Sequence, residues 1–166
     1  MTPVATRLPD THPLSRALVD AAFVCDFLRV RELLAAGANP DARDDDGRTP
    51  IFSAVLGGSV GVLGLLLEAG ADVNAQDKEG WTALHFSAQE NLPEMAQVLI
   101  GRGADVNARD SDGATPLWRA VQSSAGHPDM TSILTAAGAK DDIANAAGET
   151  PRQLAERLGF SLFDLN

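Results

Sequence analysis

Apolar residues recur along this chain at a spacing that predicts pairs of short helices. Stretches such as PIFSAVLG and ALHFSAQ place apolar residues three and four positions apart, which is the spacing of one face of an α-helix. A second, more continuously apolar stretch follows each of them, for example VGVLGLLLEAG and EMAQVLIG. Polar segments rich in Asp, Asn and Gly separate the pairs and predict turns, and no long β-branched alternation indicates a strand.

The pattern has a fixed period. Gly47, Gly80 and Gly113 recur every 33 residues, and Gly148 follows after 35. A threonine stands two residues after each of these glycines, where its hydroxyl can cap the helix that follows. A Gly-Ala pair ends each second helix and suits a left-handed C-cap. Self-similarity at this period indicates a repeat architecture in which neighbouring helix pairs stack on one another.

The motifs resemble those of the ankyrin repeat. The string T-A-L-H begins at Thr82, T-P-I and T-P-L begin at Thr49 and Thr115, and G-A-D-V-N-A occurs twice. This resemblance covers about residues 14 to 160 and implies an all-α ankyrin-repeat solenoid of about five stacked helix pairs with short β-turn fingers. It also implies that His85 bonds Thr82. Phe52 and Trp118 stand at the position of that histidine in other repeats, where the bond would be lost.

The repeats divide the chain into a flexible N-terminal segment, residues 1–13, and one ankyrin-repeat domain, residues 14–166. The expected repeats span residues 14–43, 44–76, 77–109, 110–144 and 145–166. The terminal repeats are expected to act as caps, because one face of each meets water. In the first, Ser15 is expected to cap the helix and the outer positions Asp26, Arg29 and Arg31 are polar. The last is too short for a second helix, and Leu162, Phe163 and Leu165 are expected to fold back on the core.

Two repeats are irregular. The fourth carries two extra residues within QSSAGHPDM, which should lengthen the turn between its helices. The second has Gly61 and Gly64 inside a helix, each costing about 1 kcal/mol relative to Ala. We therefore expect it to be the least stable internal repeat. The alternative is that these glycines allow close packing against the neighbouring helix.

The composition narrows the kinds of partner and the cellular compartment that we expect. The formal net charge is −10, which disfavours nucleic acid and anionic membrane surfaces and favours a basic protein partner, unless the charge serves solubility alone. The single cysteine, Cys25, cannot form an internal disulfide and is expected to pack. The first residues do not resemble a signal peptide. We expect a cytoplasmic monomer.

No constellation of residues predicts catalysis. His12, His85 and His127 fall in three different contexts, without ligands at metal-binding spacing, and Cys25 has no neighbouring base. The segment GGSVG lacks the lysine that follows a phosphate-binding loop. We expect no catalytic residue, no metal and no cofactor, and therefore no enzyme.

The family resemblance implies that a partner binds the concave face made of finger tips and first helices. Trp81 is the expected anchor, because tryptophan is enriched among residues that dominate binding energy, although it could instead lie along a neighbouring finger. Trp118 and Arg119 are expected to extend a patch with Trp81 and Phe86; the alternative is that Trp118 fills the space of the motif histidine. The expected partner-binding residues are Asp45, Asp46, Arg48, Leu56, Lys78, Glu79, Trp81, Phe86, Gln89, Glu90, Ser111, Asp112, Trp118, Arg119, Gln122 and Ser123.

Two functions fit a small binding module. The TPLWRAV repeat with its longer SSAGHPDM turn resembles short bacterial ankyrin proteins that serve as immunity proteins beside secreted toxins. That resemblance implies that the chain neutralises a cognate toxin, for instance a nuclease whose substrate groove is basic. The alternative is a general scaffold or regulatory adaptor.

Overall fold

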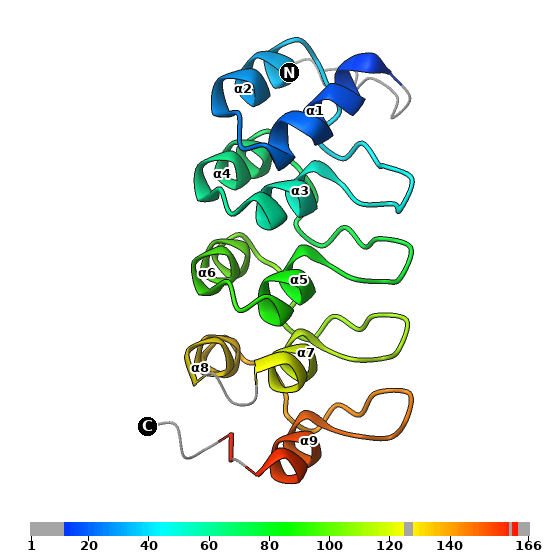
Figure 1. Cartoon of the computed structure of the whole chain (residues 1–166), viewed down its shortest axis with the longest axis vertical. Coiled ribbons are helices and arrows are strands. Elements are labelled where there is room, and N and C mark those ends of the chain that lie inside the picture. Colours follow the sequence, from blue (N-terminus) through cyan, green and yellow to red (C-terminus); the bar gives the residue numbers. More distant parts are fainter. Residues whose placement is uncertain (1–11, 125–127, 160, 163–166) are drawn as a thin grey trace, which may run out of the picture. The chain divides into compact units, whose positions relative to one another are not determined.

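The computed structural model describes residues 12–124, 128–159, 161 and 162, and within these residues all regular structure is helical (Figure 1). The helices form two compact units, Met1–Lys78 and Glu79–Asn166. The first unit contains α1 (Pro13–Phe23), α2 (Phe27–Ala35), α3 (Pro50–Gly57) and α4 (Val60–Glu68). The second contains α5 (Ala83–Gln89), α6 (Pro93–Gly101), α7 (Pro116–Ser124), α8 (Pro128–Ala136) and α9 (Pro151–Leu158). No helix among the described residues is long and apolar enough to cross a membrane.

In the N-terminal unit, two helix pairs pack side by side. Helix α1 packs on α2 and on α3, while α4 packs on α3 and on α2. The apolar residues that the sequence places at helical spacing meet between these four helices and are fully buried: Leu18, Leu33, Ile51, Phe52, Leu63 and Leu66. Burial of this apolar surface against the neighbouring pair is the main favourable contribution to folding.

The C-terminal unit repeats the arrangement. Helix α7 packs against α5, α8 and α9, and α6 packs against α5 and α8. Its fully buried side chains include Leu84, Leu99, Leu117, Met130, Leu134 and Leu154. In each unit the polar loops project beyond the first helices, away from the second helices (Figure 1). The predicted all-α architecture of helix pairs and finger turns is confirmed, and among the described residues the last repeat has one helix, α9.

The fingers are built by one recurring turn. Asp44, Asp110 and Asn145 each accept, through Oδ1, the backbone N–H groups two and four residues further on. The turn needs a left-handed residue three positions after its first residue, which Gly47 supplies with φ of 79°. A side-chain acceptor at the first position and glycine at the fourth therefore explain the polar segments of the sequence.

Consecutive fingers are joined through their backbones. Lys78 N donates to Asp46 O at 3.0 Å, and Ser111 N donates to Glu79 O at 2.9 Å. The approach is so close that a Cβ on Gly80 would lie 2.9 Å from Ser111 N. Each finger is therefore positioned by the next one.

The first helix corrects one expectation. Ser15 does not cap it, because α1 begins at Pro13 and His12 is the N-cap, with its Nδ1 accepting from Leu14 N at 3.2 Å. Proline has its φ preset for the first turn of a helix, which fixes the earlier start. Ser15 is instead buried and accepts from Asn39 N at 3.3 Å.

Several expectations concern residues outside the described part. These are the flexible segment up to residue 11, the two-residue insertion around residues 125–127 with His127, and the packing of Phe163 and Leu165. Leu162, by contrast, is described and buried.

The glycines of α4 are not explained by close packing. A Cβ on Gly64 would meet no atom within 4 Å, and one on Gly61 would make an ordinary contact with the Phe27 ring at 3.6 Å. The glycine that a close approach requires is Gly57, where a Cβ would lie 2.6 Å from Phe23 O and 2.7 Å from Cys25 Sγ.

We expect Gly64→Ala and Gly61→Ala each to raise the free energy of unfolding by about 1 kcal/mol, because alanine restricts the unfolded chain and fits the helix. Gly57→Ala should lower it, because the methyl group collides with backbone. Urea unfolding followed by far-UV circular dichroism measures all three. A loss of stability in Gly64→Ala would show that α4 requires its glycine for another reason.

Candidate protein-binding surface

His85 links its own repeat to the next finger. Its Nδ1 accepts from Thr82 N at 3.1 Å and lies 2.9 Å from Thr82 Oγ1, while its Nε2 lies 3.2 Å from Ala114 O. Because a backbone N–H can only donate, Nδ1 carries no proton, and Nε2 donates to the carbonyl. The Thr82–His85 bond that the family resemblance implies is therefore present. Burial of the imidazole lowers the pKa of His85.

The two repeats without this histidine lose the bond, as expected. Phe52 is fully buried, and the Thr49 hydroxyl is buried without a hydrogen-bond partner. Thr115 keeps only the cap, accepting from Trp118 N at 3.3 Å. The Trp118 side chain is 7% exposed and its Nε1 has no partner, which favours the interpretation that its ring fills the space of the histidine.

The C-terminal unit contains a buried cation that contacts its fingers. Arg119, on α7, is 8% exposed. Its Nε and Nη2 donate to Asp110 Oδ2 at 2.8 and 2.6 Å, and Nη2 also donates to Asp112 Oδ2 at 2.7 Å. The Asp110 carboxylate is itself fully buried. Removal of either partner would leave an uncompensated buried charge, so this ion pair ties the fourth finger to α7.

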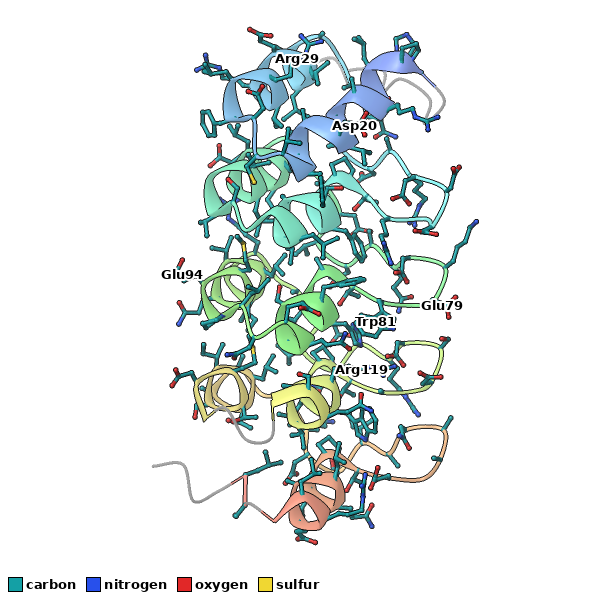
Figure 2. The ribbon with its side chains drawn as sticks, in the orientation of Figure 1. Asp20, Arg29, Glu79, Trp81, Glu94 and Arg119 are labelled. Atoms are coloured by element: carbon teal, nitrogen blue, oxygen red, sulfur yellow. The ribbon has the colours of Figure 1, made fainter. Side chains whose placement is uncertain are left out.

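Aromatic rings enclose the same cation. The Arg119 guanidinium carbon lies 4.7 Å from the centroid of the Trp81 ring and 5.4 Å from that of the Trp118 ring. Trp81 comes from the preceding finger, and Figure 2 shows it beside Arg119. Its ring also lies 4.8 Å from the Phe86 ring of α5, at a tilt of 53°. Stacking on a desolvated guanidinium and on a second ring holds the indole in one orientation.

The chain matches the family model described as ankyrin repeats (3 copies) over residues 18–110 and 76–145. It belongs to the ankyrin-repeat family. As an ankyrin-repeat protein it is a protein–protein interaction module. A search of curated proteins finds no match.

In this ankyrin-repeat protein, some of the expected partner-binding residues gather in the C-terminal unit. Trp81 and Phe86 are half-buried and in contact, with Trp118 and Arg119 buried beside them. Gln122 joins them by accepting from Arg119 Nη1 at 3.4 Å. The rings of Trp81 and Phe86 are therefore the accessible part of this cluster, and the two buried residues support it. Of the other expected residues in this unit, Glu79, Glu90, Ser111, Asp112 and Ser123 are exposed, while Gln89 is half-buried.

The remaining expected residues lie in the N-terminal unit. Asp45, Asp46 and Lys78 are exposed at finger tips, and Arg48 is half-buried 3.4 Å from Asp46. Leu56 is exposed at the end of α3, beside Gly57, whose Cα faces the turn between α1 and α2. It therefore lies with the helix–helix turns and not with the fingers.

Two features were missed by the sequence reasoning. Asp110 is one of many finger carboxylates, and only its burial against Arg119 distinguishes it. A hollow of about 340 Å³ lies between α1 and the finger of the second repeat, lined by Ser15, Arg16, Val19, Asp20, Ala42, Arg43, Asp44 and Asp45. Asp45 is the one residue of this hollow among the expected partner-binding residues. Within the described residues, no three His, Cys, Asp or Glu side chains are placed to hold a metal ion.

A matched pair of isosteric substitutions tests the value of the Thr–His bond. Thr82→Val should lower the free energy of unfolding by about 1–2 kcal/mol, because the cap and the histidine lose a partner. Thr49→Val should leave stability unchanged or raise it, because that hydroxyl is buried without a bond. Chemical denaturation of both variants decides this, and equal losses in the two would contradict it.

His85 also predicts a pH dependence. In the folded chain the His85 imidazole is protonated only at a lower pH than in the unfolded chain, where a histidine has a pKa of about 6.5. Between these values the unfolded state binds more protons, so stability falls as the pH drops below about 6.5. His85→Gln should retain the cap, as Gln153 does beside Thr150, but should lose this slope. Urea midpoints at several pH values from about 7.5 to 5.5 measure it, and identical slopes in both proteins would contradict the assignment.

Proposed function

We propose that this protein binds one dedicated protein partner through its fingers and first helices, with Trp81 as the main anchor. The observation that supports this most directly is the restraint on the Trp81 ring, which is stacked on Arg119 and on Phe86 while remaining half-exposed. A side chain that is already ordered loses little entropy on binding. Indole rings in such positions are frequent hot spots of protein interfaces.

Charge indicates the chemistry of the partner. Arg119 is neutralised by Asp110 and Asp112, so it adds no free positive charge to the surface. Glu79, Glu90 and Asp112 of the same unit are exposed, and the chain as a whole carries −10. A basic partner would be steered toward such a surface, and its association rate would fall as salt rises.

We propose that this binding serves toxin immunity in a bacterial cytoplasm. The monomeric chain would cover a basic active site, such as that of a nuclease. Nucleic acid would not be a partner, because the acidic surface repels phosphate. A scaffold or regulatory adaptor is the alternative. An immunity protein has one partner whose activity it blocks, whereas an adaptor has several partners of lower affinity.

The test is affinity capture from the native host, followed by titration of the captured protein. We expect one partner in a one-to-one complex, and we expect Trp81→Ala to weaken binding by at least about 30-fold, the loss typical of a hot spot. Glu94→Ala is the matched control, because Glu94 is exposed on α6, away from the fingers (Figure 2).

Folding is monitored by far-UV circular dichroism, which the anchor substitution should leave unchanged. Equal affinities of Trp81→Ala and the unmodified chain would contradict the assignment of Trp81 as the anchor. Capture of several weak partners, with no enzyme or toxin inhibited, would favour the adaptor.

A further inference from the structure

The exposed apolar side chains of this protein are concentrated at one place. Of the seven large apolar residues that are exposed in the described part of the chain, six belong to the first two repeats, and they are between 36% and 69% exposed. They flank the α1–α2 turn and the α3–α4 turn. We name this group the apolar turn surface; its members are Phe23, Val24, Phe27, Leu28, Leu56 and Val60.

The two turns that these side chains flank are held against each other. The Cys25 thiol donates to Gly57 O at 3.1 Å, from a backbone with φ of 58°. A Cβ on Gly57 would lie 2.6 Å from Phe23 O, and one on Gly61 would lie 3.6 Å from the Phe27 ring. Leu56 and Val60 adjoin these two glycines in the chain. The contacts join the apolar residues of one repeat to those of the next.

The role of the first repeat as a terminal cap does not explain why these apolar side chains are exposed. A cap is expected to turn polar residues outward, and Asp26, Arg29 and Arg31 do so, whereas Phe27 and Leu28 between them are exposed as well. An aromatic side chain presents about 150–250 Å² when fully exposed and an aliphatic one somewhat less, so at these exposed fractions the group offers on the order of 500 Å². Apolar patches of that extent on a monomer usually mark an interaction site.

The area and the charge of the apolar turn surface indicate what kind of partner would bind there. A stable dimer buries about 800 Å² on each partner, which is more than this surface offers, and two copies carrying −10 each would repel. Asp26, directly before Phe27, is exposed as the N-cap of α2, whereas Asp20 lines the hollow beside α1. Arg29 is paired with Glu32 at 3.3 Å, so Asp26 faces one remaining cation of α2, Arg31, and the net charge of −10 favours a basic partner segment.

We propose that the apolar turn surface docks a short amphipathic helix whose apolar face is bordered by lysine or arginine. The apolar face of the helix covers the six side chains, and its basic residues face Asp26 and the acidic chain. This surface belongs to the N-terminal unit and the Trp81 cluster to the C-terminal unit, so the two sites consist of different residues.

The test uses the full chain and three synthetic peptides of about four helical turns. The first has a leucine face bordered by lysine, the second has glutamate in place of lysine, and the third has the composition of the first in an order that breaks the apolar face. Binding is measured by the fluorescence anisotropy of labelled peptides. We expect the first peptide to bind, and the other two to bind at least about tenfold more weakly.

Variants then locate the binding site. Val24→Ser and the double variant Val24→Ser/Leu28→Ser should weaken binding of the first peptide progressively, to about tenfold for the double variant. The matched control is Leu158→Ser, which alters the remaining exposed large apolar residue in the described part, on α9. It should have no effect, and neither should Trp81→Ala, which separates this test from that of the proposed function. Circular dichroism and urea midpoints verify the folding of each variant.

Three outcomes would overturn the proposal. The first is no preference for the lysine-bordered peptide over the other two. The second is binding that Val24→Ser/Leu28→Ser leaves unchanged. The third is a dimer in sedimentation that the same double variant dissociates, because the occupant would then be a second copy of the chain.

Discussion

The constraint on which this protein depends is that a pair of short helices cannot bury its own apolar face. Each pair described here has 7 to 11 residues per helix, too short to be stable alone in water. The neighbouring repeat supplies what is missing. It supplies the apolar surface that covers Leu18 and Leu84, the carbonyl of Ala114 that accepts from His85, and the backbone groups that join one finger to the next. Stability and shape therefore arise between repeats.

The same dependence produces the candidate binding surface. The Trp81 side chain is half-exposed on its own finger. The cation that holds its ring, Arg119, belongs to the following repeat. Arg119 is in turn held by Asp110 and Asp112, on the finger that precedes its own helix. A desolvated guanidinium needs both its carboxylates and its rings, so the group is ordered as a whole or not at all. The fixed orientation of the Trp81 ring, which we propose as the anchor, therefore follows from the way the repeats join.

Periodic and local features were predictable from the sequence. The glycine–threonine spacing, the helix pairs and the Thr82–His85 bond depend on residues within one repeat, and they are found in the structure. Other features depend on which side chains meet in space. Asp110 has the sequence signature of a solvated finger carboxylate, and its burial by Arg119 is a tertiary effect. Ser15 failed as a cap because Pro13 sets an earlier helix start. Phe27 and Leu28 have the pattern of core residues, yet no described segment covers them.

The central claim is that the fingers and first helices, ordered by their neighbours, form the partner-binding surface. Hydrogen–deuterium exchange of the chain, alone and in complex with its captured partner, tests this most directly. We predict that the complex slows exchange in residues 79–90 and 110–123, which contain the third and fourth finger tips with α5 and α7, and leaves α6 and α8 unchanged. Protection confined to α6 and α8, with the fingers exchanging as they do in the free chain, would contradict the claim.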